Sequence, residues 1–403
     1  MALNVKVGLV GALDMLKFKN MAKVREEAIQ AAPAREVDGN FTINTKAKEL
    51  HPDYQELVVC KVIDHDEAGA KTFVLKRPDG KPVAYFRAGQ YLSLKMQIGT
   101  SFITRPYSIS SSPKLALEGK YCITVKTNPG GFAADYMLEN LHLGNKIVVS
   151  DPQGQFYYED LRDGYNILAL AGGSGITPFL SMARAIRDGI EKFNLTILFG
   201  SRTEDSILFK EELSEISKVC PKVKVVHVLS DEEKDGFEHG FITAELIKKY
   251  LLDNSSIFIC GPEAMYRFLD GEIPKLGLPK RLVRREILGV TKHVEDHEGY
   301  PAECIGKTFT IKVCRGPEET EIPAAAGESV LVALERAGIK APSRCRSGEC
   351  GWCRSKLVSG DVFIPEETDG RRWADKEHNY IHPCASFPVS DLVLEVAGEY
   401  LEQ

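Results

Sequence analysis

Between residues 51 and 158, apolar and polar positions alternate in short runs that turn-forming residues separate. A period of two is typical of β-strands with one buried face. The predicted strands are Glu56–Ile63, Lys71–Leu75, Tyr91–Met96, Tyr121–Thr127 and Lys146–Val149. So many short strands in roughly a hundred residues predict a small antiparallel β-barrel.

The pattern changes in residues 159–295, where short apolar runs alternate with segments of helical period. The predicted strands are Ile167–Ala171, Thr196–Gly200, Lys224–Leu229 and Ser256–Cys260, and the predicted helices are Pro178–Asp188, Leu208–Val219 and Thr243–Tyr250. This alternation predicts a doubly wound α/β domain with a parallel sheet, whose ligand lies at the carboxyl ends of the strands. The charged, histidine-rich segment Thr291–Gly299 predicts a solvated linker that ends the domain.

A third pattern covers residues 296–403 and predicts a compact α+β domain. Its predicted strands are Thr308–Cys314 and Glu321–Pro323, and its predicted helix is Val330–Gly338. The chain is therefore predicted to be a multidomain protein.

Residues 1–50 lack strong strand alternation, and we predict that they form an N-terminal extension of unknown role. Asp14–Ala32 is predicted to be a helix that Pro33 ends. Val37–Thr45 is polar and rich in turn-forming residues.

Composition narrows the class of protein. A length of 403 residues allows two to four domains, and 43% apolar and 27% charged residues are ordinary for a globular chain. The 51 basic and 57 acidic residues give a net charge of −6, so a nucleic acid is not an expected partner. Met1–Phe18 carries charged residues and lacks a cleavage site, so we predict no signal peptide, no transmembrane segment and a cytoplasmic location.

Four of the ten cysteines form the most specific pattern in the chain. Cys345, Cys350 and Cys353 lie in one loop with four and two residues between them, and Cys384 follows after thirty more. C-x4-C-x2-C with a distant fourth cysteine is the plant-type [2Fe–2S] arrangement, in which thiolates hold two irons that move one electron at a time. Buried or zinc-bound cysteines are the alternative, although zinc sites usually pair two short cysteine knuckles.

The residues around these cysteines support the cluster interpretation. Gly348 and Gly351 allow the backbone to fold closely around the sulfurs, and backbone amides there would tune the redox potential. The segment Arg344–Cys353 resembles the cluster loop of plant-type ferredoxins, and the resemblance covers about the last hundred residues. It implies that residues 296–403 form a ferredoxin-like β-grasp domain.

The barrel segment carries the tetrapeptide Arg105-Pro106-Tyr107-Ser108 at the end of a β-run. An arginine can pair with a diphosphate, a tyrosine face can stack on a flavin ring, and a serine hydroxyl can hydrogen-bond the ring edge. Further along, a glycine pair and a following helix start allow close approach to phosphate oxygens. The predicted flavin-binding residues are Arg105, Pro106, Tyr107, Ser108, Val125, Lys126, Gly130, Gly131, Phe132, Ala133 and Ala134. A strand edge with a glycine turn is the alternative.

A glycine-rich turn follows the first strand of the α/β domain. Its residues are Gly172, Gly173, Ser174, Gly175, Ile176, Thr177 and Pro178. Glycines at a tight turn and a helix N-terminus are suited to a pyrophosphate, and proline is well tolerated in a first helical turn. Cys260, Gly261 and Pro262 end the last strand of the same sheet, where a ligand crevice is expected. A turn without a ligand and a core cysteine are the alternatives.

The residues after two other strands bear on which nicotinamide dinucleotide binds. Asp231 lies in the acidic run Ser230–Glu233, where carboxylates would repel a 2′-phosphate but accept hydrogen bonds from ribose hydroxyls. Ser201 and Arg202 follow the preceding strand and could reach a phosphate. NADH is therefore favoured, and NADPH stays open. A solvated acidic loop without a ligand is the alternative.

The order of these motifs resembles the ferredoxin-NADP reductase superfamily of flavin-dependent reductases. With a plant-type cluster domain behind it, the chain resembles the reductase components of bacterial oxygenase systems, including the phenylacetyl-CoA oxygenase and hybrid-cluster-protein reductase types. The resemblance spans residues 51 to 403 and does not reach the first fifty.

The resemblance implies roles for individual residues. Arg105 would bind the flavin phosphate, Tyr107 would pack on the isoalloxazine, and Ser108 would lie near its N5 atom. Cys260 would lie against the nicotinamide, and Glu286 falls where relatives keep an acidic or aromatic group near the flavin. Ala134 stands where the family usually has serine or threonine, which keeps FMN open beside FAD.

Together these features predict an oxidoreductase that passes electrons from NADH through FAD and a [2Fe–2S] cluster to a separate protein, such as an oxygenase. Because a nicotinamide gives up two electrons as hydride and a cluster accepts one, a flavin must stand between them. A non-catalytic electron-transfer subunit of a larger complex and a stand-alone flavin or ferric reductase are the alternatives.

Overall fold

The computed structural model describes residues 9–32, 41–127 and 131–397, and the chain divides into two compact units, Met1–Glu49 and Leu50–Gln403. Helix α1 (Leu9–Ala31) confirms the predicted N-terminal helix, which begins earlier than expected. Helix α2 (Thr42–Leu50) contradicts part of the prediction of a turn-rich segment over residues 37–45, of which residues 37–40 lie outside the described residues. Every residue of α2 is exposed, so tertiary packing within the described chain does not explain it.

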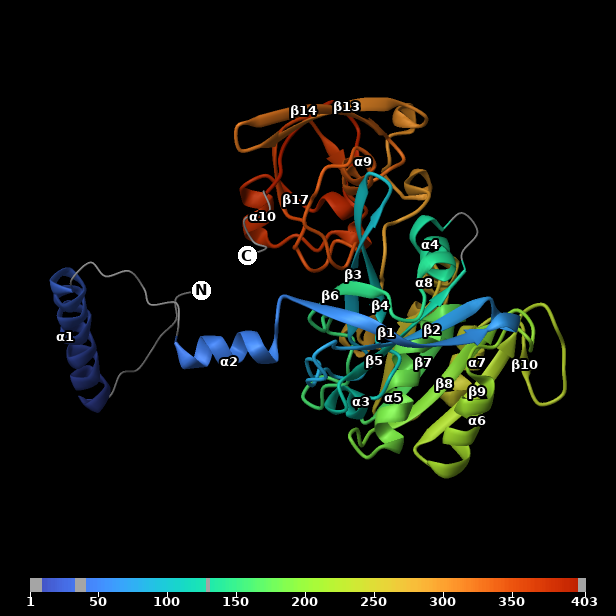
Figure 1. Ribbon diagram of the computed structural model, residues 1–403. Coiled ribbons are helices and arrows are strands. Elements are labelled where there is room, and N and C mark those ends of the chain that lie inside the picture. The colour runs from blue at the N-terminus through green and yellow to red at the C-terminus, as the bar shows by residue number, and fades with distance from the viewer. Residues whose placement is uncertain (1–8, 33–40, 128–130, 398–403) are drawn as a thin grey trace. The chain divides into compact units, whose positions relative to one another are not determined.

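The first domain of the second unit is the predicted β-barrel (Figure 1). Its strands are β1 (Tyr54–His65), β2 (Ala70–Lys76), β3 (Tyr91–Ile98), β4 (Ser101–Ser108), β5 (Lys120–Lys126) and β6 (Lys146–Ser150). They pair antiparallel in the order β4-β3-β6-β1-β2-β5, and a bridge between Ile109 and Ile123 joins the segment after β4 to β5. Helices α3 (Pro113–Leu117) and α4 (Phe132–Asn140) complete the domain.

Alternation along the barrel strands places one face of each strand in a common core. Leu57, Phe73, Leu94 and Tyr121 are among its fully buried side chains. All five predicted strands are confirmed, and β4, which carries the Arg105 motif, is the sixth.

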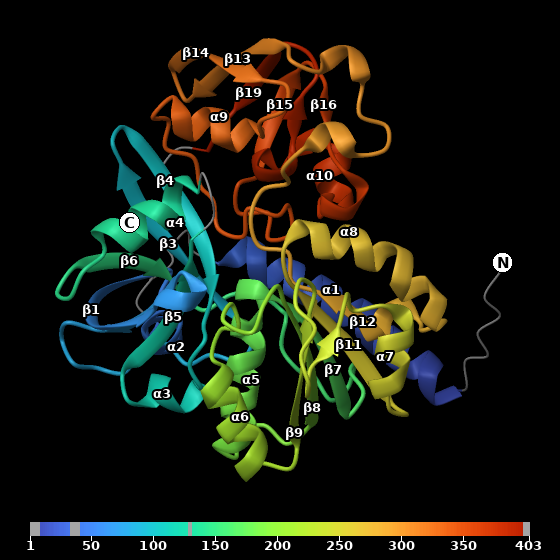
Figure 2. The same ribbon diagram turned by 90° about the vertical axis from the view of Figure 1, so that its right-hand side faces the viewer.

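The second domain is a parallel sheet with helices on both faces (Figure 2). Its strands are β7 (Asn166–Gly172), β8 (Asn194–Ser201), β9 (Val223–Leu229), β10 (Glu238–His239), β11 (Ser255–Cys260) and β12 (Val283–Arg285), and its helices are α5 (Thr177–Arg187), α6 (Lys210–Val219), α7 (Ala244–Tyr250) and α8 (Glu263–Glu272). The cores place α5 and α6 on one face and α7 and α8 on the other.

In the strand order β10-β9-β8-β7-β11-β12, β7 and β11 are neighbours. The chain reverses its winding direction between these two strands. A ligand of a doubly wound sheet binds outside the carboxyl ends of the strands at this switch point. The glycine-rich turn after β7 and the Cys260 turn after β11 therefore meet at the predicted crevice.

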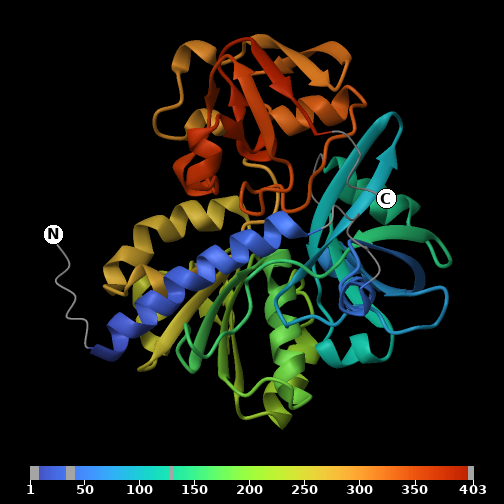
Figure 3. The same ribbon diagram turned by 90° about the vertical axis from the view of Figure 1, so that its left-hand side faces the viewer.

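The third domain is a mixed sheet with one packed helix, as in a β-grasp fold (Figure 3). Its strands are β13 (Thr308–Arg315), β14 (Glu318–Ala325), β15 (Ser355–Ser359), β16 (Val362–Phe363), β17 (Tyr380–Ile381), β18 (Phe387–Pro388) and β19 (Leu392–Glu395), and its helices are α9 (Val330–Arg336) and α10 (Trp373–Glu377). β13 and β19 pair parallel at the centre, and Val330, Ala333 and Leu334 of α9 pack against the sheet.

Helix α5 joins the barrel to the α/β domain. The Ser181 hydroxyl donates to the Ser111 carbonyl at 2.7 Å, and Arg184 donates through Nη1 to the Ser110 carbonyl at 2.7 Å. Arg184 also pairs with Glu212 at 2.6 Å, which keeps the half-buried guanidinium neutralised. The helix that follows the glycine-rich turn is thereby fixed beside the end of β4.

Glycine is required where the turns after β7 and β11 meet. A Cβ atom added to Gly175 would overlap the Cys260 carbonyl, and one added to Gly172 would lie 2.7 Å from the Met265 sulfur. These backbones therefore approach more closely than any side chain permits.

A substitution pair tests this packing. Gly175→Ala should lower the free energy of unfolding by at least about 2 kcal/mol, because backbone atoms must move to admit the methyl group. Gly271→Ala, at an exposed position of α8 with no atom near the added Cβ, should stabilise the chain by roughly 0.5 kcal/mol. Urea unfolding of both variants measures the difference, and equal stabilities would contradict the packing described.

Candidate functional site

The four predicted cluster cysteines converge between α9, β15 and the segment before β18. Cys345, Cys353 and Cys384 are buried, and Cys350 is half-buried. The Sγ atoms of Cys353 and Cys384 lie 3.4 Å apart. Hydrogen bonds from Cys350 and Cys384 hold the pKa of the Cys345 thiol well below its ordinary value.

Backbone amides surround these sulfurs. Cys345 accepts from the amides of Ser347 at 3.5 Å and Cys350 at 3.4 Å. Cys384 accepts from Gly348 at 3.2 Å, and Cys350 accepts from Trp352 at 3.4 Å. Amide donors stabilise thiolates, so the donor set is suited to sulfur ligands of a negatively charged cluster.

The arrangement differs from that of a single-ion site. Within the described ranges, no group of three or more His, Cys, Asp or Glu side chains is placed to hold one metal ion. The spacing of the four cysteines predicts a cluster of two irons at this place. Gly348 has a φ of +80°, and an added Cβ would overlap the Thr368 carbonyl, so this position requires glycine. The predicted role of Gly348 and Gly351 around the sulfurs stays a prediction.

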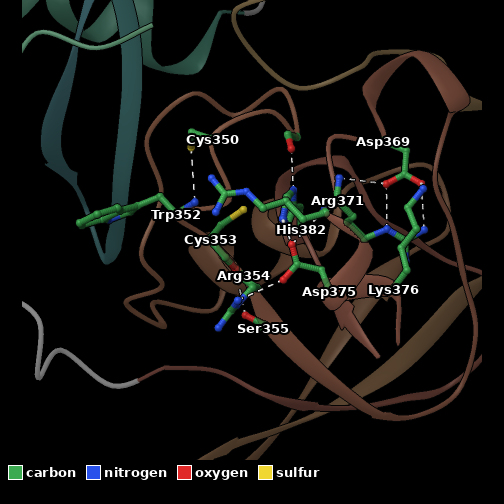
Figure 4. A network of polar contacts seen from close by, with 12 residues as sticks. Cys350, Trp352, Cys353, Arg354, Ser355, Asp369, Arg371, Asp375, Lys376 and His382 are labelled. Carbon is green, nitrogen blue, oxygen red and sulfur yellow. Dashed lines mark hydrogen bonds and ion pairs between the residues drawn. The ribbon is translucent and has the colours of Figure 1, made fainter. Parts of the chain in front are cut away.

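A polar network outside the cysteine motif supports the cluster loop (Figure 4). Buried Asp375 pairs with Arg354 at 3.1 Å and lies 3.7 Å from Nε2 of His382. The other ring nitrogen of His382 lies 2.5 Å from the carbonyl of Gly348. The loop geometry is therefore fixed by side chains outside the cysteine motif.

On the barrel, β4 presents the predicted flavin-binding residues. Tyr107 packs against the barrel core, and its burial raises its pKa to about 12. Burial, together with the nearby Arg346, lowers the pKa of Arg105 to about 10. Ser108 is buried at the strand end opposite Tyr91. A guanidinium, an aromatic face and a hydroxyl thus follow one strand edge, as a phosphate-bearing flavin requires.

The helix start after the glycine pair is partly described. Gly131 precedes α4, Phe132 is half exposed, Ala133 is buried, and Ala134 packs on the barrel core. Gly130 lies outside the described residues. The flavin contacts predicted for Pro106 and Val125, which lie in β4 and β5, stay predictions, as do those of this helix.

The glycine-rich turn forms a short 3-10 helix over Gly173–Ile176 before α5. Gly173 has a φ of +52°, and the Thr177 hydroxyl donates to the Ser174 carbonyl at 2.9 Å. Pro178 lies in the first turn of α5, as predicted. On the adjoining strand end, Cys260 is buried, and burial raises the pKa of its thiol well above the ordinary value.

The turn after β11 is fixed by a tyrosine. The amide of Gly261 donates to the Tyr266 hydroxyl at 3.4 Å, and Pro262 precedes α8. The neutral Cys260 thiol belongs to the apolar core cluster beside α5, and its contact with a nicotinamide stays a prediction.

Candidate ribose- and phosphate-recognising groups meet at the far edge of the crevice. The amide of Ser230 donates to the Ser201 carbonyl, and the amide of Asp231 donates to the Arg202 carbonyl, both at 3.0 Å. Asp231 is exposed and accepts a 2.6 Å hydrogen bond from the Ser230 hydroxyl. Burial lowers the pKa of Lys126 on β5, and the positive charge of Arg202 lowers it further. The two cations therefore face one region.

Glu286 is a buried acid directly after β12. Its amide donates to the Ile259 carbonyl at 3.0 Å, and its carbonyl accepts from Tyr266 at 2.5 Å. Its Oε1 has no hydrogen-bond partner among the described residues. Burial, with the charges of Glu349 and Cys345, raises its pKa well above the ordinary value.

Sequence reasoning missed the contacts between the barrel and the cluster loop. Arg344 donates to Asp151 on the barrel at 3.1 Å, and its guanidinium lies 3.6 Å from the centre of the Trp352 ring. Arg346 pairs with Glu335 of α9, which lies 3.5 Å from Nη1 of Arg105. The arginines flank Cys345 in the sequence, but no local pattern identifies partners that lie far from them along the chain.

Comparison with known proteins agrees with this architecture. Models of three domain families match the chain, namely the oxidoreductase FAD-binding domain at residues 56–158, the oxidoreductase NAD-binding domain at 169–270, and the 2Fe-2S iron-sulfur cluster binding domain at 315–389. The predicted domain boundaries at residues 50, 158 and 295 stay predictions.

Individual relatives cover most of the chain. The glycine betaine monooxygenase reductase subunit of Chromohalobacter salexigens is 26% identical over 84% of this chain and 94% of its own. A component of the 1,2-phenylacetyl-CoA epoxidase of Escherichia coli is 29% identical over 85% of this chain and 97% of its own. The solved structure of phthalate dioxygenase reductase, which transfers electrons from pyridine nucleotides to [2Fe–2S], has a TM-score of 0.61 and 27% identity, and the match covers 85% of this chain and 98% of that one.

The chain is therefore an oxidoreductase with FAD-binding, NAD-binding and [2Fe–2S] domains. Its homologues are reductase components of oxygenase systems, which confirms the predicted superfamily, the predicted fold and the predicted cofactors. No helix in the described residues is long and apolar enough to span a membrane.

The cysteine assignment predicts the effect of losing one ligand. Cys384→Ser should reduce bound iron from about two atoms per chain to near zero and abolish the rhombic paramagnetic signal after dithionite reduction. Cys314→Ser, in β13 of the same domain, should keep both. Iron analysis and paramagnetic resonance measure the outcome, and a full cluster in Cys384→Ser would show that the ligand set is wrong.

The buried acid predicts a pH-dependent stability difference. Because the folded pKa of Glu286 is raised, its contribution to stability is full below the unfolded pKa and falls as pH rises toward the folded pKa. The melting temperature of Glu286→Gln minus that of the wild type should therefore increase from pH 5 to pH 8. Exposed Glu366→Gln is the control, and a difference for Glu286→Gln that does not grow with pH would contradict a buried neutral acid.

Proposed function

We propose that this protein is an NADH-dependent reductase that delivers electrons to a separate oxygenase. The observation that carries the proposal is the packing of the cluster loop against the flavin barrel and against the segment that follows β12. Arg344 of the loop pairs with Asp151 of the barrel, and the Cys345 carbonyl accepts from the amide of Gly289 at 3.4 Å. These contacts support a chain of carriers, because the three domains that would hold the cofactors adjoin one another.

A bound flavin supplies a carrier that accepts a hydride and releases electrons one at a time. Arg105, with the backbone amides at the start of α4, would hold its phosphate. The Tyr107 ring would pack on the isoalloxazine, and the Ser108 hydroxyl would hydrogen-bond its edge. FAD is the proposed flavin because the matched domain family binds it.

The chain's contribution to hydride transfer is positioning. The glycine-rich turn from Gly172 to Thr177 would bind the pyrophosphate, and the neutral thiol of Cys260 would bound the nicotinamide site on one side. Hydride transfer requires the two reacting atoms to be held about 3–3.5 Å apart, so the groups on both sides of the nicotinamide must be rigid. Glu286, neutral and without a hydrogen-bond partner for Oε1 among the described residues, would hold a proton close to the reacting rings without adding a negative charge.

The ribose end of the crevice supports NADH as the electron donor. Asp231 carries an exposed carboxylate at the edge where an adenosine ribose would lie, and a second phosphate there would be repelled. Arg202 lies on the adjoining turn and is the group that NADPH would use.

We also place the protein in the cytoplasm. All ten cysteines are free, as expected for a long chain in a reducing compartment, where NADH is available.

Anaerobic mixing with NADH tests the proposed function. The flavin absorbance of the purified protein should bleach within seconds of mixing, and dithionite added afterwards should cause little further bleaching. A non-catalytic subunit would give the opposite result, with a flavin that dithionite bleaches and NADH does not.

A charge substitution tests the choice of dinucleotide. Asp231→Ala should increase kcat/KM for NADPH relative to NADH by about ten-fold, because the repelling carboxylate is removed while Arg202 remains. Glu233→Ala, in the same acidic run, is the matched control and should shift the ratio less. A ratio unchanged by Asp231→Ala would place the ribose site elsewhere.

A further inference from the structure

A buried ion triad crosses the boundary between the flavin barrel and the ferredoxin-like domain. Glu335 of α9 is 5% exposed, and it pairs with Arg346 of the cluster loop, which is 2% exposed. The same carboxylate lies 3.5 Å from Nη1 of Arg105 on β4, whose side chain is 22% exposed. One acid therefore joins the cluster loop to the arginine predicted to bind the flavin phosphate.

The triad has one more positive than negative charge. Among the described residues, the hydrogen bonds of the Arg105 guanidinium, to the Thr104 carbonyl and to Glu335, use Nη1 alone. Nε and Nη2 are left to another acceptor. A flavin phosphate would supply that acceptor and would balance the surplus charge that burial otherwise makes costly.

The other end of the triad reaches the cluster ligands. Arg346 directly follows Cys345 and has a φ of +61°, a left-handed conformation that residues other than glycine rarely adopt. Its guanidinium pairs with Glu335 of α9. The backbone of the cluster loop is thus bound to the position of Glu335.

We propose that Glu335 is a positioning residue that couples flavin binding to docking of the ferredoxin-like domain. Phosphate, Arg105, Glu335 and Arg346 form a row of alternating charges that ends at the cluster loop. Each charge is held in place by the next, so occupation of the flavin site stabilises the docked cluster loop and the docked loop stabilises bound flavin. This proposal rests on the proposed function, because it takes Arg105 as the phosphate ligand.

Thermodynamic linkage makes the coupling reciprocal. If the docked loop strengthens flavin binding, flavin must strengthen docking by the same factor. The second contact across the boundary, Arg344 with Asp151, does not include Arg105, so loss of the triad can be separated from general loosening of the interface.

The test compares Glu335→Gln with a matched control, Glu328→Gln, in the full-length protein with its cluster. Glu328 lies just before α9 and pairs with Arg336 at the end of that helix. The dissociation constants for FAD and for riboflavin, which lacks the phosphate, are measured by flavin fluorescence. Glu335→Gln should weaken FAD binding by about ten-fold and leave riboflavin binding unchanged, because Arg105 then loses the carboxylate that holds its guanidinium in position. Glu328→Gln should change neither constant.

Hydrogen exchange provides the reciprocal measurement. FAD should slow exchange of the amides in α9 and the cluster loop in the wild type and in Glu328→Gln, and should fail to do so in Glu335→Gln. FAD binding to Glu335→Gln that is as tight as, or tighter than, binding to the wild type would overturn the proposal.

A second variant keeps the test decisive if Glu335→Gln does not fold. Glu335→Gln/Arg346→Met removes the buried pair as a whole, a change that folded proteins often tolerate, and it should show the same selective loss of FAD affinity. Failure of the wild type and of Glu328→Gln to bind any flavin would instead overturn the proposed function itself.

Discussion

The architecture depends on one constraint, which is that three domains must pack closely against one another. At the switch point, the turns after β7 and β11 are so close that Gly175 cannot carry a side chain. Helix α5, which begins at this turn, is bound to the barrel through Ser181 and Arg184. The cluster loop is bound to the barrel by another contact, between Arg344 and Asp151. Any loosening of these contacts would separate carriers that must exchange electrons.

The contacts between the ferredoxin-like domain and the barrel are charged, although the domain cores are apolar. Arg344 and Glu335 are almost fully buried on the ferredoxin-like side, and each pairs with a barrel residue of opposite charge, Asp151 and Arg105 respectively. Buried ion pairs stabilise the fold weakly, because desolvation offsets most of the attraction. A buried charge left without its partner, however, lowers the stability much more. Such pairs are suited to fixing orientation, and a domain that must present its cluster to one particular surface needs orientation more than strength.

Much of the fold follows from local sequence signals. Alternation predicts five of the six barrel strands, and the change to helical period predicts the parallel sheet. The cysteine spacing and the glycine-rich turn carry their chemistry in a few adjacent residues, so they can be identified without coordinates. The first residues of helix α2 overlap the segment Val37–Thr45, whose polar, turn-forming residues give no clear helical signal. What the sequence does not predict are pairs that only tertiary structure creates. Nothing near Glu335 in the sequence indicates that it meets Arg105, and nothing near Glu286 shows that it is buried without a partner for Oε1 among the described residues. These residues act through partners on other domains, and a single sequence contains no information about which distant residues meet.

The central claim is that both electrons of NADH cross from flavin to cluster within one polypeptide. The most direct test is the rate of cluster reduction after anaerobic mixing with NADH, followed by paramagnetic resonance over a range of protein concentrations. A first-order rate that is independent of protein concentration is predicted, because the carriers lie on one chain. A rate that rises in proportion to protein concentration would mean that the cluster is reduced by another molecule, and would contradict the account.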